Sequence, residues 1–355
     1  MTHMFVPGPV DVDDEILQAQ AQPMLPHRSK EFEEIFQRAS EKAQRLFYTK
    51  QRVLLSASSG TGLQEAAIRN FVEKKVLSCV NGAFADRWYD VAVSNGKEAE
   101  KLAFEWDQPV DPERVAAAVK SGEFEALTVV HNETSTGIQN PVNEVAEAVR
   151  AVAPDTLILV DAVSSLSGVK IETDAWGLDM VLTSSQKAIA LPPGLALAAV
   201  SDRALEKAET VANRGWYFDL LRMEKHRLKD STPATPAISL IFALDRQLDR
   251  ILAEGLEQRF ARHSAMAKHV HEWAEAHDLS MYAPEGYRSQ TVTTVKNERG
   301  IDISDLNAFL KKRGMRIANG YGPLKNVTFR IAHMGETQVS DLDALFSAME
   351  EYLKK

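Results

Sequence analysis

Short apolar runs along the chain alternate with longer stretches whose apolar residues recur at helical spacing. The apolar runs predict buried strands at residues 53–55, 76–80, 126–130, 157–160, 180–183 and 195–200. Within residues 30–47, one helical face carries Phe32, Ile35, Phe36, Ala39 and Ala43. Asp111 followed by Pro112 is typical of a helix start, and Pro141 and Pro154 bracket a further helix. Because strands and helices alternate, we expect an α/β fold in which a mostly parallel sheet lies between helices.

The pattern changes after about residue 236. Long helical patterns cover residues 237–278 with a break near Gly255, and strands are predicted near 289–296 and 326–332. A last helix is predicted to begin at Ser340-Asp341-Leu342-Asp343, which resembles a capping box. We therefore expect a large α/β domain with the N-terminal segment over residues 1–236 and a smaller α+β domain over 237–355. The extended N-terminal segment is expected to pack beside the smaller domain.

Composition and charge narrow the function classes. The chain has 355 residues, 45% of them hydrophobic, and a formal net charge of -9, which disfavours nucleic-acid binding. No apolar run approaches the roughly 18 residues that span a bilayer, and the first five residues lack the features of a signal peptide. The single cysteine, Cys79, excludes an intramolecular disulfide framework and a CxxC zinc site, so the cytoplasm is the expected location. His263, His269 and His271 do not share one helical face, so we expect solvated histidines and no metal site.

Three polar features fall at the carboxyl ends of predicted strands, where open α/β sheets bind ligands. The first is the loop Ser58-Ser59-Gly60-Thr61-Gly62, which suits an anion at a helix N-terminus but equally fits an ordinary turn. The second is Asp161, a carboxylate that in this position serves as a cofactor anchor, a metal ligand or a helix cap. The third is Lys187, whose desolvated amine would be a Schiff-base nucleophile, the alternative being a surface lysine with its ammonium in water.

Together, the three features match the needs of pyridoxal 5'-phosphate (PLP). This cofactor requires a lysine for its aldehyde, a carboxylate opposite its pyridine nitrogen and an anion cradle for its phosphate. Asp161 would keep the ring nitrogen protonated. Lys187 would form the aldimine and then move the proton between the substrate and the cofactor.

Several further motifs carry a resemblance to the class V aminotransferases of fold type I, and the match covers nearly the whole chain. Its motifs are Val6-Pro7-Gly8-Pro9, Ser59-Gly60-Thr61-Gly62 with Glu65, His131-Asn132-Glu133-Thr134-Ser135-Thr136-Gly137, Val160-Asp161-Ala162-Val163-Ser164-Ser165, and Ser185-Gln186-Lys187-Ala188 followed by Leu191-Pro192-Pro193-Gly194. Each motif is weak alone, but in this order they are specific.

The resemblance implies further cofactor contacts. Phe84 is similar to an aromatic residue that stacks on the pyridine ring, and the alternative is a buried core phenylalanine. Thr134, Ser185 and Gln186 match positions beside the cofactor, with Gln186 on the phosphate. Thr232 and Thr235 match a segment that reaches the phosphate from the neighbouring subunit, where the first position is commonly tyrosine. The resemblance thus implies a homodimer with shared active sites.

The motifs resemble alanine–glyoxylate and serine–glyoxylate aminotransferases most closely. This implies transfer of an amino group between a small L-amino acid, alanine or serine, and a 2-oxo acid, glyoxylate or pyruvate. Arg330 matches the arginine that binds the substrate carboxylate, for which a guanidinium is suited. The alternative for Arg330 is a surface ion pair at the end of a strand.

Two rival functions remain at this point. His27-Arg28 resembles a pair that contacts the substrate phosphate in phosphoserine aminotransferases, which use 2-oxoglutarate. The second basic cluster of that family is not reproduced, because only Lys325 stands there. A PLP lyase such as a cysteine desulfurase would need a cysteine on a mobile loop, whereas Cys79 lies in an apolar run.

Overall fold

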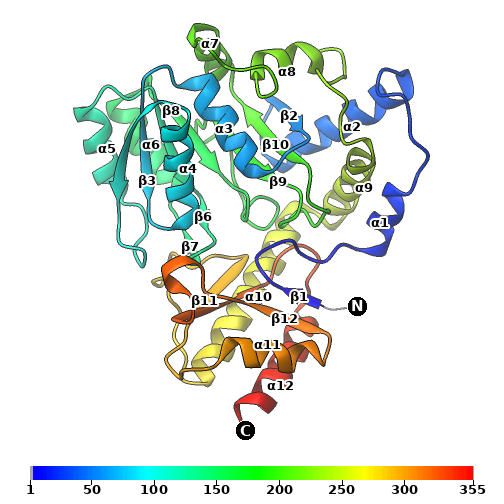
Figure 1. Cartoon of the computed structure of the whole chain (residues 1–355), viewed down its shortest axis with the longest axis vertical. Helices are drawn as coiled ribbons and strands as arrows, with labels where there is room; N and C mark the ends of the chain where they lie inside the picture. The colour runs from blue at the N-terminus through cyan, green and yellow to red at the C-terminus, as the bar shows by residue number, and fades with distance from the viewer. Residues whose placement is uncertain (1–2, 355) are drawn as a thin grey trace.

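A seven-stranded sheet forms the centre of the large domain in this computed structural model, which describes residues 3–354 (Figure 1). In spatial order its strands are β2 (Arg52–Ser56), β10 (Ala196–Val200), β9 (Met180–Ser184), β8 (Leu157–Asp161), β5 (Ala126–Val130), β3 (Lys75–Val80) and β4 (Glu98–Ala103). β10 runs antiparallel to both of its neighbours, and the other adjacent pairs are parallel. The expected mostly parallel sheet is confirmed.

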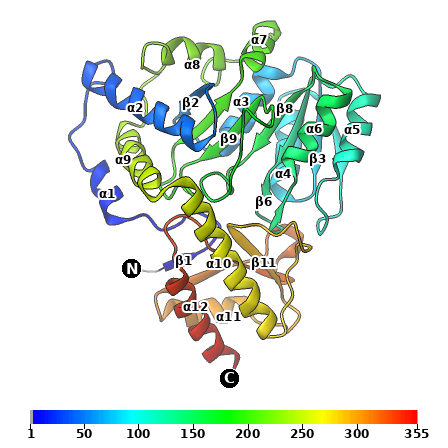
Figure 2. The same cartoon turned by 180° about the vertical axis from the view of Figure 1, so that it is seen from behind.

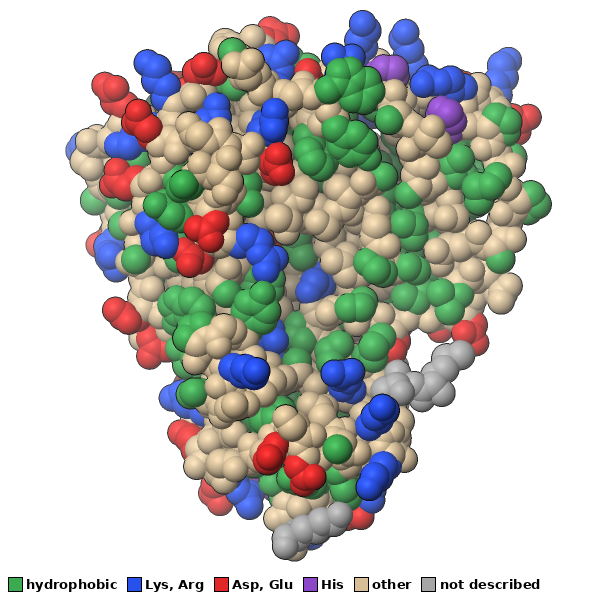
Figure 3. Space-filling view, viewed as in Figure 1, with side chains coloured by type: hydrophobic (Ala, Val, Ile, Leu, Met, Phe, Trp, Pro, Cys, Tyr) green, Lys and Arg blue, Asp and Glu red, His purple; other side chains and the backbone are tan. Residues whose placement is uncertain are grey.

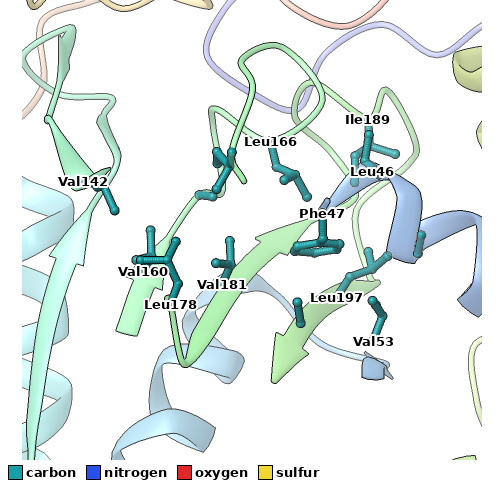
Figure 4. Packing of buried hydrophobic residues seen from close by; sticks show 14 of the residues in the cluster. Leu46, Phe47, Val53, Val142, Val160, Leu166, Leu178, Val181, Ile189 and Leu197 are labelled. Atoms are coloured by element: carbon teal, nitrogen blue, oxygen red, sulfur yellow. The ribbon is translucent and has the colours of Figure 1, made fainter. Parts of the chain in front are cut away.

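Helices cover both faces of this sheet. One hydrophobic cluster, part of which Figure 4 shows, joins the sheet to α2 (Lys30–Leu46), α5 (Pro112–Ser121), α6 (Val142–Val152) and α9 (Ile238–Glu254). A second cluster joins the other face to α3 (Gly60–Phe71), α4 (Ala83–Ser94), α7 (Asp202–Thr210) and α8 (Leu220–Arg227). Because the strands are buried on both faces, their sequences are continuous apolar runs rather than alternating patterns.

The predicted helix starts carry the caps that their residue types favour. Asp111 accepts hydrogen bonds from the backbone N–H groups of Glu113 at 2.9 Å and Arg114 at 3.2 Å, and Pro112 occupies the first helical turn of α5. α2 begins after Ser29, whose hydroxyl accepts from the N–H of Phe32. These side chains satisfy donors that a helix leaves unpaired.

The small domain is built on a four-stranded sheet in the order β1 (His3–Phe5), β12 (Met315–Asn319), β13 (Thr328–Ala332) and β11 (Val292–Lys296). The N-terminal segment does more than pack beside this domain, because β1 pairs in parallel with β12 as an edge strand. α11 (Ile303–Lys311) lies on the sheet, and Figure 2, which views the molecule from behind, shows α10 (Leu256–Ala276) crossing in front of the sheet beside α12 (Val339–Leu353). The remaining described elements are α1 (Asp14–Gln20), β6 (Asn132–Glu133), β7 (Ile138–Gln139) and the 3₁₀ turn Gly322–Leu324.

Three expectations need correction. The apolar face of α9 belongs to the large-domain core, so packing divides the domains near Gly255 rather than after residue 236. The last helix begins earlier than expected, because Gln338 and Asp341 form its capping box. His263 is fully buried rather than solvated, since it faces Gly168 of the large domain and donates a hydrogen bond from Nδ1 to the carbonyl of Arg259 at 2.8 Å.

Within residues 3–354, the structure contains no helix that is long and apolar enough to cross a membrane. Met1 and Thr2, on which part of the signal-peptide expectation rests, lie outside the described residues.

Candidate active site

A cavity with about 560 Å³ of empty volume opens where β5, β8 and β9 end and α3 and α4 begin. Its size falls within the usual range of small-molecule sites, roughly 300–1,000 Å³. Among its lining residues are sequence-predicted ones, namely Ser59, Gly60, Thr61, Phe84, Thr134, Asp161, Gln186 and Lys187. The fold therefore brings together residues that are far apart in the sequence.

Lys187 follows β9 and reaches the cavity beneath the N-terminal segment. Its ammonium donates a hydrogen bond to the carbonyl of Pro7, and a Cβ added to Gly8 would lie 2.7 Å from its Nζ. Loss of solvation, helped by the positive charge of Arg330, lowers the pKa of Lys187 to about 8. The amine is therefore deprotonated far more readily than an exposed lysine, as a nucleophile requires.

Asp161 ends β8 and is 5% exposed. Its Oδ1 accepts a hydrogen bond from the N–H of Val163 at 2.8 Å, and its Oδ2 accepts from Nε2 of Gln64 at 2.6 Å. Burial raises the pKa of Asp161 to about 6 in spite of these bonds. A cationic N–H donor in the cavity would stabilise its charged form.

The N-terminus of α3 supplies an anion-binding end to the cavity. Ser59 precedes the helix, but its side chain makes no capping hydrogen bond, so its hydroxyl is available to bind a ligand. A Cβ added to Gly60 would lie 2.4 Å from Cγ2 of Val163, which explains the need for glycine there. Unpaired backbone N–H groups and the helix dipole favour an anion at this position.

Phe84 is held at the cavity by a buried carboxylate below α4. Glu133 accepts hydrogen bonds from the N–H groups of Phe84 at 3.1 Å and Ala85 at 2.9 Å, and from the hydroxyl of Ser135 at 2.6 Å. A Cβ added to Gly82 would lie 2.3 Å from Cγ of Glu133, so a glycine is required for this approach. Burial raises the pKa of Glu133, but the hydrogen bonds at the helix N-terminus stabilise its charge.

Arg330 of the small domain is not one of the residues that line the cavity, but it contacts Thr134, which does line it. It lies on β13, is 7% exposed, and donates from Nη1 to the carbonyl of Thr134 at 3.2 Å. Its Nε donates to the carbonyl of Asn319 at 3.0 Å, and burial lowers its pKa to about 10. Carbonyl groups do not neutralise a guanidinium, so the site favours a carboxylate ligand here.

Four buried polar atoms on the cavity wall have no hydrogen-bond partner within the described residues. They are Oε1 of Gln64, Oδ1 of Asn132, Oγ of Ser184 and Oε1 of Gln186. Buried polar atoms are normally paired. Their concentration on one wall indicates that a polar molecule belongs in the cavity.

Some expected site residues lie elsewhere in this single chain. The hydroxyl of Ser185 donates to the carbonyl of Pro192 at 2.7 Å, and Ser184 lines the cavity instead. Thr232 and Thr235 line a separate pocket beside the exposed rings of Trp216 and Tyr217.

His27 and Arg28 also do not line the cavity. Arg28 is exposed and close enough to α8 for its positive charge to lower the pKa of His226, after the effect of desolvation. Cys79 is buried in β3, where burial raises the pKa of its thiol. A thiol in that position does not reach the cavity, which removes the main requirement of a cysteine desulfurase.

Sequence reasoning missed several lining residues, namely Gln64, Arg87, Asn132, Ser164 and Ser184. Helical spacing could have found two of them. Gln64 lies one turn after Gly60 on α3, and Arg87 lies one turn after Phe84 on α4.

A family model, curated relatives and solved structures match nearly the whole chain. The family model described as aminotransferase class-V matches residues 12–338. The chain is 37% identical to an uncharacterized aminotransferase of Methanocaldococcus jannaschii over 99% of this chain and 92% of that protein. It is 34% identical to an L-aspartate–glyoxylate aminotransferase of Paracoccus denitrificans over 94% of this chain and 86% of that protein. The crystal structure of an alanine–glyoxylate aminotransferase from Nostoc sp. superposes with a TM-score of 0.94 at 30% identity, covering 99% of this chain and 95% of that one.

Proposed function

Because this chain belongs to the class V aminotransferases, we propose that it transfers an amino group between a small L-amino acid and a 2-oxo acid with PLP as cofactor. The observation that carries this proposal is the pairing of Lys187 with Asp161 in one cavity. The pKa of the amine is lowered there and the pKa of the carboxyl is raised, both mainly by burial. Two titratable groups shifted in this way are characteristic of an active site.

The residues of the cavity fit PLP. Lys187 would hold its aldehyde carbon, Asp161 would face its pyridine nitrogen, and the N-terminus of α3 with Gln186 would receive its phosphate. Phe84 would lie against the ring. The four unpaired polar atoms of the cavity wall support this fit, because a bound polar molecule would supply the partners that they lack.

When bound, PLP supplies an electron sink for the carbon that carries the amino group of the substrate. Arg330 would bind the α-carboxylate and so fix the substrate in one orientation. The amine of Lys187, once free, would take the proton from that carbon. It would then move this proton to the cofactor, so that Lys187 acts first as a base and then as an acid. Asp161 would remain charged and hold the ring nitrogen in its protonated form.

The substrate pair that we propose is alanine or serine as donor and glyoxylate or pyruvate as acceptor. The names of the Paracoccus relative and the Nostoc structure both contain glyoxylate, which supports that acceptor. Phosphoserine with 2-oxoglutarate is less favoured, because His27 and Arg28 do not line the cavity of their own chain.

Half-reactions test this proposal. The PLP form is mixed with alanine, serine, phosphoserine or aspartate in the absence of an acceptor, and the absorbance of the cofactor is followed. Conversion by alanine or serine, reversed by glyoxylate, is expected. Failure of all four donors to change the absorbance would refute the proposed function.

We also propose a cytoplasmic homodimer in which Thr232 and Thr235 reach the cofactor phosphate of the partner. Exposed aromatic rings beside these threonines, Trp216 at 54% and Tyr217 at 47%, support burial against a second chain. Figure 3 shows hydrophobic side chains spread over the upper right of one face, below a row of basic side chains.

Mixed dimers test the sharing of sites. Lys187→Ala and Thr235→Glu chains, each inactive alone, should recover activity when refolded together, because one site of each mixed dimer is intact. A chain that sediments as a 39.4 kDa monomer, or mixtures that stay inactive, would contradict the proposal.

A further inference from the structure

Arg87 is a cation of the site cavity that has no acidic partner within residues 3–354. It lies one turn after Phe84 on α4, and its guanidinium carbon is 4.8 Å from the centre of the Phe84 ring. Its Nη2 donates a hydrogen bond to the neutral hydroxyl of Tyr321 at 3.1 Å. The neighbouring carboxylate of Asp86 is paired with Lys101 instead.

The other charges of the site already have partners or proposed ligands. The carboxylate of Glu133 is occupied by the backbone N–H groups at the start of α4 and by Ser135. Asp161 accepts from Gln64 and Val163 and would face the cofactor ring. Arg87 therefore keeps an unmatched positive charge on the cavity wall, and an anion would stabilise it there.

Arg87 and Arg330 approach the same side chain of the small domain. Arg87 contacts the hydroxyl of Tyr321, and the guanidinium carbon of Arg330 is 5.6 Å from the centre of the Tyr321 ring. A donor whose α-carboxylate binds Arg330 would therefore extend its side chain along Tyr321 toward Arg87.

We propose that Arg87 binds an anionic group on the side chain of the amino donor, so that the site accepts an acidic amino acid as well as a small neutral one. This inference rests on the proposed transaminase function. A planar guanidinium suits a carboxylate and a phosphate equally. Aspartate, with a side-chain carboxylate, and phosphoserine, with a side-chain phosphate, are therefore the two donors to compare.

The experiment compares the holoenzyme with Arg87→Met, which keeps the length of the side chain and removes its charge. Arg38→Met is the matched control, because Arg38 lies on α2 with its side chain 50% exposed and paired with Asp245. In wild type we expect aspartate or phosphoserine to react as a donor alongside alanine, and the better of the two identifies the anion. Arg87→Met should lower kcat/KM for that donor by about ten- to a hundredfold, the value of one charge-assisted hydrogen bond. Its kcat/KM for alanine should fall by a clearly smaller factor, because alanine has no anionic side chain for Arg87 to bind.

An equilibrium titration separates binding from catalysis. Succinate carries two carboxylates and propionate carries one. Neither molecule has an amino group to transfer. By calorimetry, succinate should bind wild type and Arg38→Met about tenfold or more tightly than propionate, and Arg87→Met should bind both alike. If no donor reacts at all, the proposed function fails, and this titration still decides the role of Arg87.

Three results would overturn the inference. One is an equal loss of alanine and acidic donors in Arg87→Met. Another is a tenfold weaker affinity for PLP in that variant, which would assign Arg87 to the cofactor phosphate. The third is an unchanged preference for succinate over propionate.

Discussion

The buried carboxylate of Asp161 should make the cofactor-free protein less stable than a variant that cannot ionise. Burial raises the pKa of Asp161 to about 6, whereas an unfolded chain has a value of about 3.9. The difference of roughly two units corresponds to about 3 kcal/mol of destabilisation where the folded carboxyl is ionised. The sign follows from the direction of the shift: the full cost is present above pH 6 and fades as the pH falls toward 4.

Asp161→Asn should remove this cost without breaking the local hydrogen bonds. The amide oxygen can still accept from the N–H of Val163. Gln64 now donates to Asp161, and its own Oε1 has no partner in the described part of the chain, so a rotated Gln64 amide can accept from the new side chain. We therefore expect the cofactor-free variant to be about 2–3 kcal/mol more stable than wild type at pH 8 and about half as much at pH 5.

Urea unfolding of the cofactor-free proteins at pH 8 and pH 5 measures this difference. Asp179→Asn is the matched control, because Asp179 is equally buried but is paired with Arg150 at 2.5 Å. That control should lose about 1–3 kcal/mol. Although the cofactor-free Asp161→Asn protein should be more stable than wild type, this variant should bind the cofactor more weakly. It should also lose most of its transamination activity. If cofactor-free Asp161→Asn is no more stable than wild type at pH 8, the account of this carboxylate is wrong.

Three further changes probe the surrounding residues. Arg28→Ala should leave kcat/KM for alanine and serine within about threefold, whereas a phosphate-bearing substrate held by Arg28 would lose about 2–4 kcal/mol of transition-state binding. Arg330→Ala should reduce kcat/KM for every donor by a similar factor of about a hundred or more, because all donors share the α-carboxylate; a loss confined to one donor would contradict this. Glu133→Ala should lower the free energy of unfolding by about 2–3 kcal/mol, since it leaves buried N–H groups of α4 unpaired, and unchanged urea unfolding would count against that role.

The sequence predicts best those strands whose two faces are both buried. Continuous apolar runs identified β3, β5 and β8 because helices cover both sides of the sheet there. β4 was missed because it is an edge strand, and its Glu-Ala-Glu-Lys pattern is mostly exposed. A short, half-exposed strand such as β12 gives a similarly weak signal.

Residues that face two environments are the hardest to predict. α10 spans from the large domain to the small one, so the face that it buries near His263 differs from that of an isolated amphipathic helix. Motif order predicted several of the residues that converge on the cavity, including Asp161 and Lys187. It could not predict that Arg87 would lack an acidic partner among residues 3–354, because pairing is decided by the approach of Tyr321 from the other domain.

The central claim is that Lys187 carries the cofactor, and one chemical measurement tests it most directly. Borohydride reduction of the purified yellow protein fixes the link between the cofactor and its amine, and mass spectrometry of the digested chain locates the pyridoxyl group. We expect this group on Lys187, with the yellow colour bleached, and no fixed pyridoxyl in a folded Lys187→Ala protein. A pyridoxyl group on another lysine, or none on a protein supplied with PLP, would contradict the account.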